Sequence, residues 1–285
     1  VDRGVDPSAT SNYAVRRAAK QGHLDVVRYL CELPVDRRVD PSANDNYAVR
    51  FAAWYGHLDV VRYLCELPAD RGVNPSVGGN LALQRAVDQG HLDVVRYLCE
   101  LPANRGVDPS ANYNYAVIWA SVKGHLDVVR YLCELSAARG VDPSARYNDA
   151  VRYAAMTGQL NVVRYLCELP VDRGVDPSER VNFALIRAAQ YRHLDVGRYM
   201  CEVPVDLAVS RYAWGNSAVQ FADEQGHLDV VRYLCELPVD RGVNPSAWTP
   251  HSALARTQQQ ALTSCARSPI LGLRALLRRR RAIVI

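Results

Sequence analysis

The stretch GHLDVVRYLCELP, residues 22–34, decides the fold of this chain of 285 residues. It returns almost letter for letter at Gly56, Gly90, Gly124 and Gly226, and weaker copies start at Gly158 and Arg192. Successive copies begin 34 residues apart. A fixed period of this size predicts a solenoid of stacked units, in which each unit contacts only its neighbours, and not a single globular core.

Composition and charge exclude several classes of protein. An apolar share of 49% is ample for a packed core and argues against intrinsic disorder. The net charge is +4, but residues 247–285 carry seven arginines and no acid, so the repeats together carry 4 − 7 = −3. A nearly neutral array argues against a broad nucleic-acid surface. We also find no apolar run long enough to cross a membrane.

The cysteines recur with the period. Seven of the eight occupy one repeat position: Cys31, Cys65, Cys99, Cys133, Cys167, Cys201 and Cys235. Helices in neighbouring units pack about 8–10 Å apart, whereas a disulfide needs Cα atoms within about 7 Å. We therefore expect free, buried thiols in a reducing, cytoplasmic compartment. A ladder of metal ligands is the alternative, but no second ligand type recurs beside the cysteines.

Each unit reads as two short helices and a loop. An asparagine that recurs in every copy, such as Asn12, is expected to cap the first helix with its side-chain oxygen. Gly22 ends that helix in a tight turn, where a positive φ is favourable. The second helix runs from about residue 23 to residue 33, with apolar residues over a wide arc, as a helix between two neighbours requires. Pro34 ends it, and a loop of about a dozen residues returns to the next asparagine.

This pattern resembles the ankyrin repeat family. The segments AVRRAAKQGHLDVVRYL and AVRFAAWYGHLDVVRYL, with their later copies, resemble the A-A-x-x-G-H-L-E-V-V-x-x-L-L segment of that family. The resemblance covers about residues 1–246. It implies an all-α ankyrin-type solenoid of about seven helix-turn-helix repeats that binds a protein partner and has no catalytic activity.

The chain also departs from the family pattern. Asn-Tyr-Ala-Val or a relative replaces the usual Thr-Pro-Leu-His opening, and the period is 34 residues instead of 33. The segment before the first helix is shorter, so we expect the projecting β-fingers to be reduced or absent. Tetratricopeptide and pentatricopeptide repeats have similar periods, but they need longer helices and shorter links than this sequence provides.

The repeat pattern divides the chain into three parts. Residues 1–12 match 35–46 and read as the end of a preceding repeat, so the chain is expected to be a piece of a longer protein. Residues 13–246 hold seven repeats, and 247–285 form a degenerate C-terminal cap with an arginine-rich tail. The sixth repeat has Arg192 in place of the turn glycine and Gly197 inside its second helix, which predicts a weak joint. Sequence drift and a functional hinge both explain it.

We find no catalytic constellation. His23 and Asp25 recur in the repeats, but residues that return every 34 positions are explained by the fold, whereas catalysis needs a unique, asymmetric site. The sequence has no phosphate-binding glycine loop and no paired metal-ligand spacing. We expect no enzyme activity, no cofactor, no metal and no small-molecule substrate.

Binding residues are expected where the copies differ. Two variable pairs, one just before each turn glycine and one just before each asparagine, are rich in Tyr, Trp and Arg, which are frequent at interface hot spots. In ankyrin proteins the matching positions line the concave face and the finger tips. The resulting partner-binding candidates are Lys20, Trp54, Tyr55, Asp88, Tyr113, Lys123, Arg146, Tyr147, Met156, Tyr191 and Trp214. The alternative is that these positions vary because nothing constrains them.

A third column alternates arginine with aromatic residues: Arg17, Phe51, Arg85, Trp119, Tyr153, Arg187 and Phe221. It is predicted to form stacked cation–π contacts along the first helices, which is a structural role.

The sequence thus predicts a monomeric scaffold for an unidentified protein partner. Two alternatives stay open. The run Arg278–Arg281 could bind nucleic acid or an anionic surface, or direct nuclear import. It could also be a solvent-exposed or packed chain terminus without a function of its own. The array could instead be a passive spacer in a longer protein.

Overall fold

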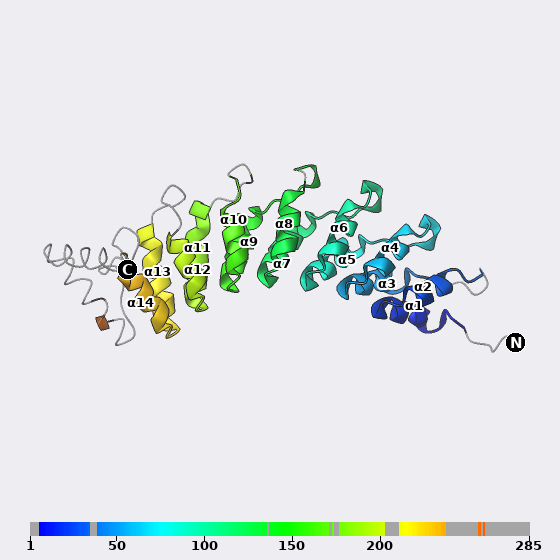
Figure 1. The fold of residues 1–285 in the computed structure, drawn as a ribbon, viewed down its shortest axis with the longest axis horizontal. Helices are drawn as coiled ribbons and strands as arrows, with labels where there is room; N and C mark the ends of the chain where they lie inside the picture. Colours follow the sequence, from blue (N-terminus) through cyan, green and yellow to red (C-terminus); the bar gives the residue numbers. More distant parts are fainter. Residues whose placement is uncertain are drawn as a thin grey trace, which may run out of the picture. The chain divides into compact units, whose positions relative to one another are not determined.

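Pairs of short antiparallel helices make up the computed structural model, which describes residues 6–34, 39–135, 137–170, 173, 177–202, 211–237, 256–257 and 259 (Figure 1). In each pair the first helix is called helix one and the second helix two. The pairs are α1 Ala9–Gln21 with α2 Leu24–Cys31, α3 Ala43–Trp54 with α4 Leu58–Glu66, α5 Val77–Gln89 with α6 Leu92–Glu100, α7 Ala111–Lys123 with α8 Leu126–Glu134, α9 Ala145–Met156 with α10 Leu160–Cys167, α11 Pro177–Gln190 with α12 Leu194–Glu202, and α13 Arg211–Glu224 with α14 Leu228–Glu236. The expected all-α repeat fold is confirmed.

The chain divides into two compact units. The first comprises residues 1–150 with Asp172–Gly174, and the second comprises Val151–Val171 with 175–285. In the first compact unit each helix one contacts the next, in the order α1, α3, α5 and α7. Each helix two likewise contacts the next, in the order α2, α4, α6 and α8. In the second unit α11 packs on α13, and α10, α12 and α14 form the corresponding row. Each compact unit therefore has two layers of helices, one formed by helix one and the other by helix two of its repeats.

The turn between the two helices of a pair depends on glycine. Gly22, Gly56 and Gly90 have φ near +75°, a conformation that other residues adopt only with strain. The next repeat adds a second reason, because a Cβ on Gly56 would lie 2.6 Å from Nδ1 of His91. The constant Gly-His pair is thus a contact between repeats as well as a helix end.

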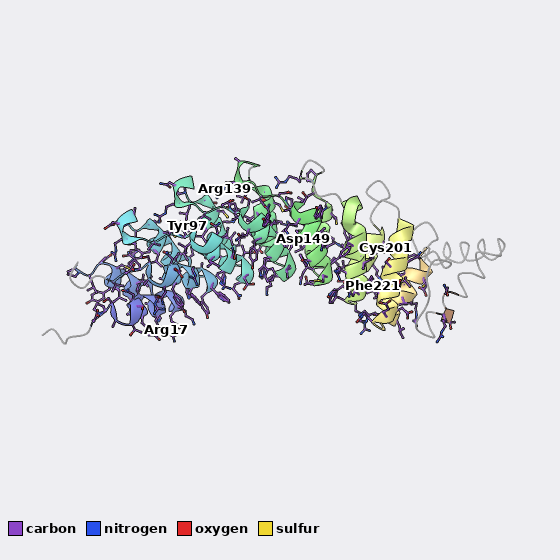
Figure 2. All side chains as sticks on the ribbon, turned by 180° about the vertical axis from the view of Figure 1, so that it is seen from behind. Arg17, Tyr97, Arg139, Asp149, Cys201 and Phe221 are labelled. Carbon is purple, nitrogen blue, oxygen red and sulfur yellow. The ribbon has the colours of Figure 1, made fainter. Side chains whose placement is uncertain are left out.

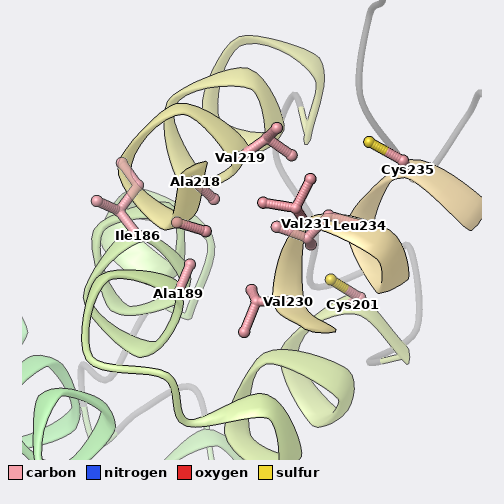
Figure 3. Packing of buried hydrophobic residues seen from close by; sticks show 10 residues of the cluster. Ile186, Ala189, Cys201, Ala218, Val219, Val230, Val231, Leu234 and Cys235 are labelled. Carbon is pink, nitrogen blue, oxygen red and sulfur yellow. The ribbon is translucent and has the colours of Figure 1, made fainter. Parts of the chain in front are cut away.

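The core lies between the two layers. In the second compact unit it joins Ile186 and Ala189 of α11 to Val219 of α13 and to Val231 and Leu234 of α14 (Figure 3). The valines and leucine of each GHLDVVRYLCELP copy supply most of the helix-two contribution, and Leu64, Leu98 and Leu132 are fully buried. Burial of a leucine side chain contributes about 1.5–3 kcal/mol.

The repeated cysteines are buried and free, as expected. Burial raises the pKa of Cys65, Cys99 and Cys133 to about 12, because the interior disfavours the thiolate. Arginines of the returning loops donate hydrogen bonds to backbone carbonyl oxygens of the preceding repeat, including those of the cysteines. Arg71 donates hydrogen bonds to the carbonyl oxygens of Cys31 and Val39, at 2.6 and 2.9 Å.

The returning loops contain short 3₁₀ helices, at Ala69–Arg71, Ala103–Arg105 and Ala137–Arg139, and no strand occurs among the described residues. The expected reduction of the β-fingers is therefore confirmed for this part of the chain. Described Asp-Pro-Ser sequences, such as residues 40–42, then form a tight turn. The Asp40 carboxylate accepts hydrogen bonds from both the backbone N–H and the hydroxyl of Ser42.

The predicted role of the asparagines is wrong. Asn12 is not a helix cap: its Oδ1 accepts a hydrogen bond from the backbone N–H of Asp40 in the next repeat, at 2.8 Å. Asn46, Asn80 and Asn114 form the same bond to the backbone N–H 28 residues later. The asparagine is constant because it connects neighbouring repeats.

A left-handed turn precedes the right-handed part of each helix one in the first compact unit. Three successive residues have positive φ, such as Thr10, Ser11 and Asn12 at 54°, 54° and 60°. The third repeat has glycine at two of these positions, Gly78 and Gly79. A long side chain from the helix bonds back to this turn, as when Arg16 Nε donates to the Ser11 carbonyl oxygen at 2.9 Å.

The sixth pair keeps its geometry despite its substitutions. Arg192 adopts the positive φ of the glycine it replaces, 65°, and its guanidinium lies 3.3 Å from the Asp229 carboxylate. Gly197 lies inside α12, which still spans Leu194–Glu202. The weak joint expected here stays a prediction.

Candidate functional site: the helix-one face

In five repeats the variable residue two positions before the turn is contacted by the histidine of the next repeat. His57 Nε2 lies 3.2 Å from the carbonyl oxygen of Lys20, and His91 Nε2 lies 3.0 Å from that of Trp54. Asp88, Met156 and Gln190 receive the same contact from the histidine 37 residues later. A carbonyl oxygen only accepts hydrogen bonds, so Nε2 carries the proton. The histidine thus fixes the backbone from which the variable side chain projects.

Aromatic rings and cations join the ends of α1, α3 and α5. Lys20 Nζ lies 5.7 Å from the ring centre of Phe51 and 5.4 Å from that of Tyr55. Trp54 stacks on Phe51 at 6.1 Å, and Arg85 covers Trp54 at 4.2 Å. Three neighbouring helices therefore share one continuous surface that contains the predicted residues Lys20, Trp54 and Tyr55.

Asp88 forms a second cluster with α7. Its Oδ1 accepts a hydrogen bond from Trp119 Nε1 at 2.7 Å and lies 3.6 Å from Lys123 Nζ, and its Oδ2 accepts one from Gln89 at 3.1 Å. Burial alone would raise the pKa of the Asp88 carboxyl, but these hydrogen bonds and the Lys123 charge outweigh it and lower the pKa. Asp88 and Lys123 are therefore paired with each other.

The variable pair before each asparagine lies in the left-handed turn. Tyr113 and Tyr147 project from it with 76% and 66% of their surface exposed. Arg146 lies over the Tyr113 ring at 5.7 Å and forms an ion pair with Asp149 at 3.0 Å. Tyr113 and Lys123 are ten residues apart on α7, or about 15 Å along a helix. The predicted site residues thus form two separate strips, one at each end of helix one.

In the second compact unit Met156 is half-buried and Tyr191 is 49% exposed. The side chain of Trp214 lies outside the described residues, and so does the predicted cap and arginine tail at 247–285, apart from residues 256–257 and 259.

The third column forms cation–π contacts, but with other partners than predicted. Arg85 stacks on Trp54 and not on Phe51, and Arg187 lies over Phe183 at 4.8 Å. The sequence treated Phe51, Arg85 and Trp119 as structural, whereas the structure brings them to the same surface as the predicted binding residues. The contacts of Arg85 with Trp54 and of Trp119 with Asp88 join non-equivalent positions of neighbouring repeats, which a column of equivalent positions does not show.

The opposite face, formed by helix two, is uniform. Its arginine lies over the tyrosine of the next repeat, as Arg28 does over Tyr63 at 5.3 Å and Arg62 over Tyr97 at 5.4 Å. A hollow of about 490 Å³ between α2 and α4 is lined by Leu24, Leu58, Arg28, Arg62 and Tyr63, together with two acidic side chains. A hollow with equivalent lining lies between α10 and α12. Figure 2 labels Arg17 of helix one and Tyr97 of helix two.

The described ranges contain no group of three or more His, Cys, Asp or Glu side chains placed to hold a metal ion. None of their helices has both the length and the hydrophobicity that crossing a bilayer requires.

A comparison with protein families agrees with the fold. A family model described as ankyrin repeats (3 copies) matches residues 3–76, 67–147, 100–181 and 154–246. Among solved structures, an ankyrin repeat family protein from Legionella pneumophila is 20% identical, with a TM-score of 0.40, over 84% of this chain and 72% of that one. No curated protein matches. Because the family model covers most of its length, this chain belongs to the ankyrin repeat family.

Proposed function

We propose that this chain is a non-catalytic scaffold that binds a protein partner through its helix-one face. Ankyrin repeats generally mediate protein–protein interactions and are typically non-catalytic. In ankyrin repeat proteins the corresponding face is the concave surface of the array. The observation that carries the proposal is the exposure of large aromatic side chains at positions that differ between repeats. Constant histidines also contact the backbone of the variable residues Lys20 and Trp54 on the same face.

Aromatic side chains in this setting favour binding over simple drift. Tyr55, Tyr113 and Tyr147 are 46%, 76% and 66% exposed. Exposed tyrosines lose little conformational entropy on binding and are frequent hot spots. Tyr113 and Tyr147 also occupy strained left-handed positions, where a glycine would be more favourable. Keeping a large ring at such a position favours a role for the ring itself.

The test is quantitative affinity capture with two matched variants. Tyr55→Ala plus Tyr113→Ala removes two rings from the helix-one face. Tyr29→Ala plus Tyr63→Ala removes two from the helix-two face of the same compact unit. We expect recovery of at least one partner to fall about tenfold or more in the first variant only, as the loss of interface hot spots predicts. Equal recovery in the two variants would overturn the proposal.

A further inference from the structure

The charges of the helix-one face in the first compact unit are stabilised by rings more than by carboxylates. Arg16 lies over Tyr47 at 5.1 Å, Lys20 lies over Phe51 and Tyr55, and Arg85 lies over Trp54. We call these seven residues and Arg17 the cationic aromatic strip. A ring attracts a cation without neutralising it, so the positive charge remains available to a ligand.

Arg17 adds an exposed charge to this strip. It occupies in α1 the position of Phe51 in α3 and Arg85 in α5, and it forms no ion pair with any described residue (Figure 2). Arg16 is held by hydrogen bonds to the carbonyl oxygens of Ser11 and Thr10, at 2.9 and 3.0 Å. Side chains that are already ordered lose less entropy when a ligand binds.

The two faces of this compact unit carry opposite net charge. The helices α1, α3, α5 and α7 carry six cations (Arg16, Arg17, Lys20, Arg50, Arg85 and Lys123) and two acids (Asp45 and Asp88), a net charge of +4. The four helix-two segments at 24–32, 58–66, 92–100 and 126–134 each carry one arginine and two acids, together −4. Asp88 is engaged by Trp119, Gln89 and Lys123, so its charge is already compensated.

We propose that the cationic aromatic strip binds an acidic peptide segment of the partner, with carboxylates against Arg17 and Lys20 and an apolar side chain against Trp54 and Tyr55. This inference rests on the proposed function and specifies the partner's chemistry. Charge complementarity selects an acidic segment and raises its association rate. The rings supply apolar contact, and aromatic residues with arginine are the common anchors of protein interfaces.

A peptide fits these observations better than a nucleic acid. Nucleic-acid affinity comes from many phosphate contacts along a continuous basic stripe. Here Asp45 is exposed on α3, Asp88 follows on α5, and the repeats as a whole carry about −3. A short strip with four cations and four rings matches a few carboxylates and an apolar side chain.

Fluorescence anisotropy of the full chain tests the proposal. The probes are a labelled twelve-residue peptide that alternates Glu with Leu, its counterpart that alternates Lys with Leu, and a single-stranded oligonucleotide of twelve nucleotides. The variants are Arg17→Glu plus Lys20→Glu on the strip and, as the matched control, Arg28→Glu plus Arg62→Glu on helix two. Circular dichroism verifies that both fold.

We expect the glutamate peptide to bind at least about tenfold more tightly than the lysine peptide, with affinity that falls as salt rises. The strip variant should lose about tenfold or more, and the control variant less than about threefold. Equal binding of the two peptides, equal loss in the two variants, or tighter binding of the oligonucleotide through Arg17 and Lys20 would overturn the proposal.

A second copy of this chain is the remaining occupant, because its helix-two face is acidic. Sedimentation of the unlabelled chain distinguishes it: a dimer that the strip variant dissociates would overturn the peptide assignment. Failure of the acidic peptide, with partner recovery still dependent on Tyr55 and Tyr113, would reject this inference and leave the proposed function intact.

Discussion

Helix one and helix two of a repeat both pack against their counterparts in the neighbouring repeats, but their sequences vary in opposite ways. Helix two repeats LDVVRYLCE almost unchanged, and in α4 it buries Val60, Val61 and Leu64. Helix one keeps its inward apolar residues, while the half-buried position near its end changes from Lys20 to Trp54 to Asp88. Constancy thus marks contacts between repeats, and variation marks the positions at which we propose that a partner binds.

The largest expected effect comes from the helix-two core. Leu98→Ala removes a fully buried side chain from α6 and should lower the free energy of unfolding by about 2–5 kcal/mol, through lost burial and a residual cavity. Gln89→Ala, on the exposed end of the preceding helix, should change it by less than about 0.5 kcal/mol. Urea denaturation measures both. Similar losses in the two variants would contradict the division between the faces.

The buried cysteines predict a loss of stability at high pH. The folded-state pKa of Cys99 is raised to about 12 by burial, above the unfolded value of about 8.5. The native state therefore holds this proton more tightly, and its contribution is complete below pH 8.5 and is lost as pH rises toward 12. At pH 10 that loss is about 2 kcal/mol for one cysteine.

Cys99→Val isolates this contribution. The free energy of unfolding of the variant, compared at pH 7 and pH 10, should fall by about 2 kcal/mol less than that of the unchanged chain. An equal fall in both chains would show that the Cys99 thiol is not the group that titrates.

The sequence predicted the parts of the fold that depend on local chemistry. Gly22 ends a helix with positive φ because that requirement lies within one repeat. The buried Leu98 and the free Cys99 follow from the apolar pattern of helix two and the regular spacing of stacked helices. It missed bonds that connect repeats. Asparagine is a typical helix-capping residue, so the sequence suggested that role for Asn12. Only the structure shows that the Asn12 side chain lies within hydrogen-bond distance of the Asp40 backbone N–H. Similarly, the contact of Arg85 with Trp54 joins non-equivalent positions of two neighbouring repeats, and only the structure shows it.

A smaller effect is expected at the contact between the turn glycine and the next histidine. Gly56→Ala places a methyl group at positive φ and 2.6 Å from His91 Nδ1, so we expect a loss of about 2 kcal/mol. His91→Ala removes the ring, and in that background Gly56→Ala should lose only about 1 kcal/mol, the conformational part. The double-mutant cycle measures a coupling of about 1 kcal/mol. Additive losses would mean that the ring moves aside freely.

The smallest effect is expected where stability and the proposed binding oppose each other. Tyr113 has φ +59° in the left-handed turn and is 76% exposed, whereas the third repeat has Gly79 at the equivalent position with φ +71°. Tyr113→Gly relieves about 1–2 kcal/mol of backbone strain and loses part of that gain to the greater freedom of glycine in the unfolded chain. We expect a net stabilisation of about 0.5–1 kcal/mol in urea denaturation, together with weaker partner capture.

Tyr113→Ala provides the control for that result, because alanine removes the ring and keeps the strain. It should leave stability within about 0.5 kcal/mol and weaken partner capture as much as glycine does. If glycine stabilises the chain and neither variant affects capture, the ring at Tyr113 is only tolerated, and the turn strip is a surface free to vary. If both weaken capture, strain is retained at this position because the ring is needed there.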